Sequence, residues 1–263
     1  ARLLAGATVE ASAIGNTTAV YGEGSTVAGI ISQGSSATIR ASNLASPQYI
    51  PADAAFSSEA IANAVAVNSD AASNQSLYVR QRSTGDVIEA GTSANAGNAW
   101  DLAGRARASG NRAVFQNQGG ALIAETDQAN AAQVRATTIT TAYDYGAAEA
   151  SARAAGNEVS VGNNDVYVEI DNTQLNTGGV DATATFSGTN GYDVYVGADA
   201  VGNSVTGYAC SECAGYLTAT NVQTNNGSVT ATANTSVAGS SRAVITGTNA
   251  VGNAATFYVS RPG

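Results

Sequence analysis

The two cysteines are the residues whose spacing most resembles a chemical site. Cys210 and Cys213 enclose Ser-Glu, a spacing also found in zinc sites and in thioredoxin-like redox centres. A tetrahedral zinc site needs further Cys or His ligands, but the chain has no other Cys and no His. No βαβ pattern supports a redox centre. We therefore expect a local disulfide formed in an oxidising compartment, ahead of free thiols and, last, a metal site.

Acidic residues are the next candidates, because calcium prefers several oxygen ligands. Asp165, Asp171, Asp193 and Asp199 could supply them, but their spacing matches no calcium-binding loop. A solvated acidic face is the favoured interpretation. The chain lacks both Lys and His, and its Arg residues are scattered. No nucleophile can therefore be paired with a neighbouring base. The sequence therefore predicts no catalytic site, no cofactor and no bound metal.

The strongest signal is a repeat marked by asparagine and glutamine. The asparagines follow one another at intervals of 47, 48, 46, 46 and 50 residues, and each of the first five precedes a glutamine by 17, 18, 17, 17 and 20 residues. A β-branched residue follows each glutamine six residues later, at Ile39, Val87, Val134, Val180 and Val229. The two rows are Asn16, Asn63, Asn111, Asn157, Asn203, Asn253 and Gln33, Gln81, Gln128, Gln174, Gln223.

This spacing predicts one repeat array over residues 1–263 rather than separate globular domains. It holds about five and a half copies of a unit of roughly 47 residues. The unit boundaries lie near 9–55, 56–101, 102–147, 148–192, 193–243 and, for the partial last unit, 244–263.

Within each unit, Ala, Val and Thr alternate with polar residues as in a β-strand. The apolar fraction is 44%, but Phe occurs four times, Trp once and Met never, which favours a narrow core. We predict an all-β fold, a β-solenoid (β-helix), in which side-chain amides donate to and accept from their own copies in ladders. The glycine of each Gly-Asn pair is expected at a corner with positive φ. A helical turn over 54–66 is the alternative at the alanine-rich stretch, and Ser46–Pro51 is expected to be a loop.

Charge and hydropathy exclude several partners. The net charge is −9, which would repel nucleic acid or an anionic membrane surface. No apolar run approaches the roughly 18 to 20 residues of a membrane helix, so we expect no membrane insertion. Ala1 fits the first residue of a mature secreted product, although any internal boundary would give the same start. We therefore expect an extracellular or cell-surface location.

Short motifs in these repeats resemble those of a known family. They are Ala150 to Asn157, Gln128-Ala-Asn-Ala-Ala-Gln-Val134 and Gln174-Leu-Asn-Thr-Gly-Gly-Val180. They resemble bacterial holdfast-attachment proteins and, more distantly, curli subunits, in which Gln and Asn form internal ladders. The resemblance implies an extracellular surface fibre or anchor, although the loops and the irregular glutamine spacing within each half depart from the curli pattern.

Two functions follow as hypotheses. The first is a non-enzymatic structural subunit that assembles head to tail into a surface fibre for adhesion, anchoring or biofilm matrix. Its partners would be further copies of itself, with a surface polysaccharide or an outer-membrane anchor as additional candidates. The second is a monomeric binding module whose flat face recognises polysaccharide or ice. Thr137, Thr183 and Thr232 share one repeat position, but Ser42 and Gly91 interrupt that row.

Overall fold

The protein is built from parallel β-sheets. In the computed structural model, residues 5–165, 167–210 and 215–259 are described, and within them the secondary structure is strand and turn without helix. Each strand pairing is parallel. The predicted all-β class is therefore confirmed, and none of the described residues forms a helix able to span a membrane.

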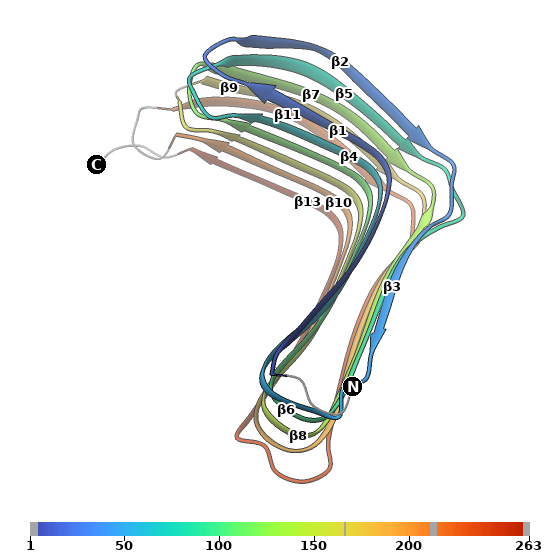
Figure 1. The fold of residues 1–263 in the computed structure, drawn as a ribbon. Helices are drawn as coiled ribbons and strands as arrows, with labels where there is room; N and C mark the ends of the chain where they lie inside the picture. The colour runs from blue at the N-terminus through green and yellow to red at the C-terminus, as the bar shows by residue number, and fades with distance from the viewer. Residues whose placement is uncertain (1–4, 166, 211–214, 260–263) are drawn as a thin grey trace.

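The strands follow one another in a regular order (Figure 1). They are β1 (Ala7–Gly22), β2 (Thr26–Ser35), β3 (Ile39–Ala45), β4 (Tyr49–Ser69), β5 (Asn74–Ser83), β6 (Val87–Asn117), β7 (Ala121–Asn130), β8 (Gln133–Asn163), β9 (Tyr167–Asn176), β10 (Val180–Ala209), β11 (Tyr216–Asn225), β12 (Val229–Val237) and β13 (Ala243–Val259).

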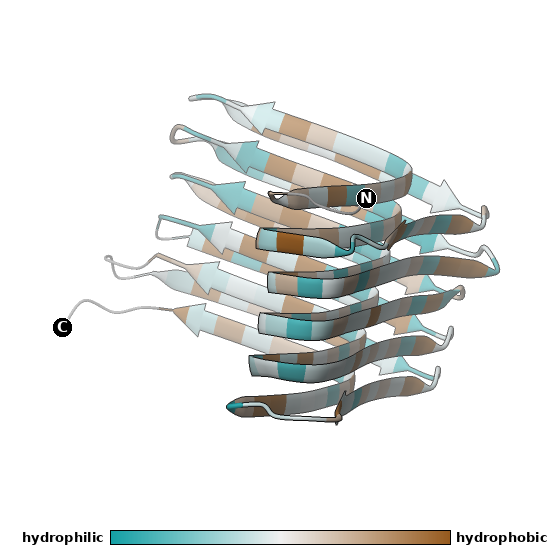
Figure 2. Cartoon of the chain, turned by 60° about the horizontal axis from the view of Figure 1, so that its bottom comes forward, coloured by the Kyte–Doolittle hydropathy of each residue, from teal (hydrophilic) through white to brown (hydrophobic). Residues whose placement is uncertain are grey.

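The chain returns to lie beside itself after each circuit of 46 to 50 residues. One circuit runs through three walls, which Figure 1 shows nearly end-on. The lower outer wall contains β3, β12 and the first parts of β6, β8 and β10. The bent wall contains β1, β13, most of β4 and the second parts of β6, β8 and β10. The upper outer wall contains β2, β5, β7, β9 and β11. Successive circuits stack as separate layers in Figure 2.

The bent wall changes direction midway, so the cross-section has two arms that meet at an elbow (Figure 1). The lower arm encloses one apolar core, made mostly of Ala and Val with Phe56 and Phe186. The upper arm encloses a second core around Val79, Phe115 and Ile170. Small residues on facing strands allow the two walls of each arm to approach closely. The narrow interior expected from the composition is therefore divided into two cores.

The elbow glycines have a different role from the one predicted. Among the described residues, positive φ occurs at Gly24, Gly120 and Cys210, and not at the glycine of any Gly-Asn pair. These glycines lie inside strands, where a Cβ at Gly156 would meet both Asn176 Oδ1 and the Gly202 carbonyl oxygen at 2.5 Å. The expectation of a positive-φ corner was wrong, because what the elbow requires is close approach rather than a left-handed backbone.

In the second unit, the position before the row asparagine holds a residue larger than glycine. Ala62 replaces glycine before Asn63, and the residue that corresponds to Asn130 in that circuit is the smaller Ser83. In the later circuits, glycine at the elbow accompanies asparagine at this facing position: Gly110 with Asn130, Gly156 with Asn176, and Gly202 with Asn225. The size of the side chain at the facing position therefore limits whether the elbow position must be glycine.

One local alternative is excluded and two local expectations need correction. Residues 54–66 belong to strand β4, so the alternative of a helical turn is excluded. The expected loop at Ser46–Pro51 is shorter, because β4 begins at Tyr49, and the register shifts between Ile50 and Asp53 as it passes Pro51. In the second unit, Ile88 rather than Val87 lies in register with Ile39 and Val134. One additional residue in the preceding turn explains this offset.

The close approach at the elbow gives a first prediction. Gly156→Ala should lower the free energy of unfolding by about 1–3 kcal/mol, because the new Cβ must displace backbone or a buried amide. Gly162→Ala is the matched control on the same strand, since its Cβ would have no neighbour closer than 3.8 Å. Urea denaturation of both variants measures the difference, and equal stabilities would contradict the packing argument.

Candidate functional site

The asparagine row runs along the inside of the elbow. Asn63, Asn111 and Asn157 lie in register, and each Nδ2 donates to Oδ1 of the asparagine in the next circuit at 2.7–2.8 Å. The row extends from Asn16 at one end to Asn253 at the other. The Nδ2 of Asn157 also donates to the Leu175 carbonyl, just after the glutamine of its own circuit. Each amide in the row therefore joins neighbouring circuits and also two walls.

The glutamine row faces the asparagine row from the upper outer wall. Its amides donate toward the preceding circuit, whereas the asparagine amides donate toward the next circuit. Gln128 Nε2 donates to Gln81 Oε1 of the preceding circuit at 2.7 Å and to the Glu158 carbonyl at 3.1 Å. The same pattern recurs from Gln81 to Gln223. The asparagines thus bond the backbone beside the glutamines, and the glutamines bond the backbone beside the asparagines. This reciprocal pattern fixes the spacing of the walls between the two cores.

A further amide row was missed by the sequence analysis. Asn130 donates to Asn176 at 2.8 Å, and Asn176 donates to Asn225 at 2.7 Å, where the upper outer wall ends. Each also donates to a carbonyl two residues later in its own turn. The signal was present in the sequence, because these asparagines recur two residues after the marker glutamines.

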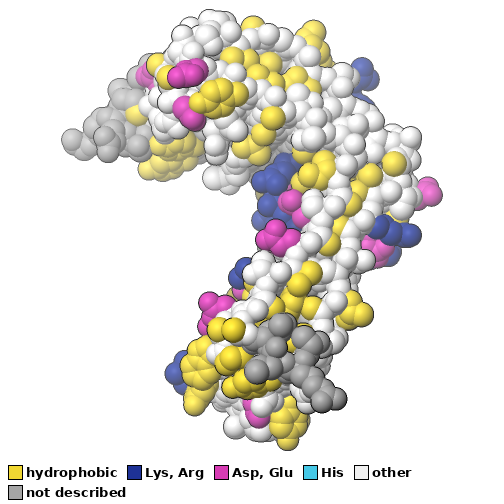
Figure 3. Space-filling view, viewed as in Figure 1, with side chains coloured by type: hydrophobic (Ala, Val, Ile, Leu, Met, Phe, Trp, Pro, Cys, Tyr) yellow, Lys and Arg dark blue, Asp and Glu magenta, His cyan; other side chains and the backbone are white. Residues whose placement is uncertain are grey.

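Opposite charges gather on the hollow side of the bend (Figure 3). Glu158 is buried, and its carboxylate accepts hydrogen bonds from Arg107 at 3.1 Å, Arg153 at 2.8 Å and Ser109 at 2.8 Å. Burial alone would raise the pKa of Glu158, but the charges of Arg107 and Arg153 and the hydrogen bonds outweigh it. The pKa of this carboxyl therefore lies below its ordinary value. Arg153 also pairs with Asp199 at 3.0 Å in the next circuit.

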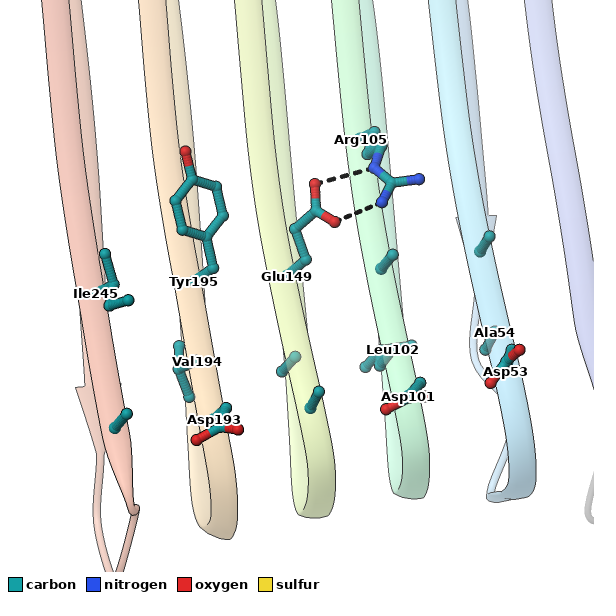
Figure 4. Close-up of a pocket in the computed structure, with 15 residues that line it drawn as sticks. Asp53, Ala54, Asp101, Leu102, Arg105, Glu149, Asp193, Val194, Tyr195 and Ile245 are labelled. Carbon is teal, nitrogen blue, oxygen red and sulfur yellow. Dashed lines mark hydrogen bonds and ion pairs between the residues drawn. The ribbon is translucent and has the colours of Figure 1, made fainter.

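An open groove of about 830 Å³ lies farther down the same face of the bent wall (Figure 4). Its floor is apolar and includes Ala103, Ala147 and Ile245, with Tyr195 half exposed beside them. One rim carries aspartates, and the other carries a two-bond ion pair of Arg105 and Glu149. The rim aspartates are Asp53, Asp101 and Asp193.

The aspartates of the rim differ in their electrostatics. Partial burial raises the pKa of Asp101, and hydrogen bonding and like charge from Asp53 raise it further, against a lowering hydrogen bond from the Ala147 backbone. Asp193 is partly exposed, and its pKa is lowered by the hydrogen bond and charge of Arg242. Arg242 also lies over the ring of Tyr192, 5.7 Å from its centroid. The groove therefore combines an apolar floor with rims of uneven charge.

Exposed aromatic rings continue the groove toward the tip of the lower arm. Trp100 and Tyr192 meet edge to face with ring centroids 6.3 Å apart, and both are more than half exposed. They line a smaller hollow that shares Asp101 and Asp193 with the groove. Rings of this kind provide large, rigid and amphipathic contact surfaces.

The first and last strands of the bent wall have free edges in the described part of the chain. There β1 pairs with β4 alone, and β13 pairs with β10 alone. The strands of the last circuit, β11, β12 and β13, contain no charged residue, and β1 and β2 contain only Glu10. Interior strands are more highly charged; β8 alone carries Arg135, Asp144, Glu149, Arg153 and Glu158.

The other candidates from the sequence do not form a common site. The predicted disulfide falls partly outside the described residues, because Cys213 is not described; Cys210 itself is buried and directly follows β10. Asp165, Asp171, Asp193 and Asp199 belong to different places, with Asp165 accepting from the Gly120 amide. Within the described residues, no three Cys, Asp or Glu side chains gather where they could hold a metal ion. The threonine row does lie in register, from Thr137 through Thr183 to Thr232, on the outward side of the lower outer wall.

The Glu158 network gives a prediction about pH. Because the folded-state pKa of Glu158 is lowered, the stabilisation is complete above the ordinary Glu pKa and is lost as pH falls through the folded value. Glu158→Gln should therefore cost about 2–3 kcal/mol of unfolding free energy at pH 7, since it removes one partner of a buried ion pair. The difference from wild type should shrink at pH 3.

The control is Glu149→Gln, which breaks the more exposed pair with Arg105 and should cost about 1 kcal/mol or less. Chemical denaturation at both pH values measures all three proteins. A cost for Glu158→Gln that stays the same at pH 3 would contradict the assignment.

Comparison with known proteins agrees with an attachment role. Residues 1–179 match the family described as HfaD, holdfast attachment protein D. No curated protein and no solved structure matches the chain. The family description implies a location at the cell surface and suggests a structural rather than an enzymatic part in adhesion. Since the match covers more than half of the sequence, the chain belongs to the holdfast attachment protein D family.

Proposed function

We propose that the protein is a non-enzymatic structural subunit that assembles end to end into an extracellular fibre for surface adhesion. The observation that carries this proposal is the pair of free edges that β1 and β13 have among the described residues, with a single charged residue between the two strands. A free edge presents a row of unpaired N–H and C=O groups, and proteins that remain monomeric usually protect it with charge, proline or a covering segment. In these two strands, only Glu10 supplies such protection.

The repeat architecture supports the same proposal. We interpret the chain as one β-solenoid of about five and a half repeats, because pairing partners recur every 46 to 50 residues. In such an array each repeat is stabilised by its neighbours, and within the described residues the first and last repeats each have a neighbour on one side only. A second copy would supply the missing neighbour. The array would be one unit over residues 1–263.

The polar groups of the molecule favour a structural role over catalysis. The side-chain amides of the ladders bond to one another and to backbone carbonyls. In the groove, Glu149 is held by Arg105 and Asp193 by Arg242. Without His or Lys in the sequence, the groove offers no obvious nucleophile with a base beside it. Proposed partners are therefore further copies of the chain and, at the cell, an outer-membrane anchor.

The assembly proposal predicts what shortening β13 should do. The full chain should form filaments visible by negative-stain electron microscopy and large species in sedimentation velocity. A chain ending at Asn253 removes the last part of β13, residues 254–259, and should give folded monomers, with the β-sheet signal retained in circular dichroism. A chain ending at Val259 keeps β13 intact and should still polymerise. Monomers of the full chain at high concentration would overturn the proposal.

A second candidate function is binding of polysaccharide in the groove. The observation that favours it is the combination of Tyr195, Trp100 and Tyr192 with carboxylates on one open face. Aromatic rings can pack against the flat faces of sugars, and carboxylates can accept hydrogen bonds from hydroxyl groups. The flat threonine row is a weaker alternative, because Ser42 and Gly91 interrupt it.

This candidate predicts a loss of glycan binding when the rings are removed. Trp100→Ala combined with Tyr195→Ala should weaken retention of the protein on immobilised surface polysaccharide by about tenfold or more, or roughly 1.4 kcal/mol. Tyr216→Ala removes an equally exposed ring from the upper outer wall and should leave retention unchanged. Equal retention of both variants would remove the groove from consideration.

A further inference from the structure

We infer that copies of the chain join through the bent wall alone, with β13 of one copy paired in parallel with β1 of the next and Asn253 placed over Asn16. This inference rests on the proposed end-to-end assembly and adds the strands and the register of the junction. It is carried by the direction of the amide rows and by the side chains that this register brings together.

The asparagine row has complementary ends. Along the row each Nδ2 donates toward the C-terminal end, so Asn203 donates to Asn253 at 2.7 Å. Asn253 Nδ2 then has no further asparagine to bond among the described residues and reaches only the Gln223 carbonyl, at 3.5 Å. At the opposite end, Asn16 donates to Asn63, and no described group donates to Asn16 Oδ1. A second copy placed in register supplies the missing acceptor to Asn253 and the missing donor to Asn16.

The glutamine row ends differently, within the chain itself. Gln33 Nε2, which would donate to a preceding glutamine, donates instead to Thr18 Oγ1 at 3.1 Å. Thr18 lies in register with Val65, and the same position in the later circuits is again apolar: Ala113, Val159, Val205 and Ala255. The one hydroxyl in this column therefore satisfies the first glutamine without a second copy. At this end the donor of the glutamine row is therefore satisfied within the chain, whereas the acceptor of the asparagine row is not.

The order of strands also separates the walls at the junction. The last bent-wall strand, β13, lies one layer beyond β11 in the stack, whereas β1 and β2 lie in the same layer. When β13 meets β1, β11 and β2 are therefore apart by the width of one strand. By the same count, β12 and β3 are also one strand apart. The junction thus depends on β13 and β1.

Side chains in this register match. Tyr208 and Tyr258 are stacked with ring centroids 6.1 Å apart and planes at 6°, and Tyr21 of the next copy would extend the stack beyond Tyr258. Tyr21 lies five residues after Asn16, just as Tyr258 lies five residues after Asn253. Glu10 would lie opposite Gly247, so the only charge on either strand meets no like charge.

Cysteine cross-linking tests the register. Thr8 and Ile245 are exposed and occupy one column of the bent wall. An equimolar mixture of Thr8→Cys and Ile245→Cys proteins should form disulfide-linked dimers on mild oxidation, because neighbouring parallel strands lie about 5 Å apart, within disulfide range. Each variant oxidised alone controls for Cys210 and Cys213.

Two further mixtures define the alternatives. Glu10→Cys with Ile245→Cys is two residues out of register and should give less than a tenth of the dimer. Ile30→Cys with Thr220→Cys would link β2 to β11, which share a column of the upper outer wall, and should not cross-link. If either mixture links more efficiently than Thr8→Cys with Ile245→Cys, the proposed junction is wrong even though end-to-end assembly stands. If the full chain never polymerises, the proposed function fails first.

A single-atom change tests the amide contact. Asn253→Asp keeps the oxygen that accepts from Asn203 but replaces the donor aimed at the next copy with a charged oxygen facing Asn16 Oδ1. The concentration needed for polymerisation should rise by about tenfold or more, while the melting temperature of the monomer changes little, because the monomer itself loses only the 3.5 Å hydrogen bond to the Gln223 carbonyl. Asn234→Asp adds the same charge to exposed β12 in the last circuit and should leave polymerisation unchanged. Equal effects of the two variants would overturn the junction.

Discussion

Hydrogen bonding between identical side-chain amides is the constraint on which the rest of the structure depends. A buried amide must both donate and accept, and an unmet donor or acceptor costs about 1–3 kcal/mol. The asparagine of the next circuit meets this need at Asn111 and Asn157 because it presents the same two groups in the same orientation. Each circuit must therefore place its amide in register with the amide of the preceding circuit. Additional residues are consequently confined to turns. The additional residues of the fifth circuit, near Cys210, follow this pattern.

The same constraint explains how two thin cores coexist in one chain. Ala and Val cores such as those around Ala154 and Val161 have little lateral depth. A sheet that bends between them would expose backbone polar groups at the bend unless something bonded them. The asparagine and glutamine side chains do so, since they take the carbonyls of Leu175 and Glu158 at that point. The asparagine and glutamine rows therefore separate the two apolar cores.

The sequence predicted the strand class and the positions that would stack, because period and alternation are properties of the chain itself. Asn157 and Gln128 could be placed from spacing alone. The bend could not, since a repeat shows which residues lie above one another and not the direction in which a wall turns. The role of Gly156 was misjudged for a related reason. Its partner, Asn176, comes from another part of the circuit, and only the fold brings the two together. The groove beside Tyr195 likewise arises from side-chain heights on five neighbouring strands.

The bent cross-section of Figure 1 has a mechanical consequence. A flat stack of strands bends easily about the axis that lies in its own plane. Two arms set at an angle resist bending about both axes perpendicular to the stacking direction, because each arm stiffens the direction in which the other bends easily. Within one copy, tension along the stacking direction is shared among the backbone hydrogen bonds of the three walls, so no single wall separates before the others. For a protein of the holdfast attachment protein D family, that geometry makes each copy stiff through many individually weak bonds.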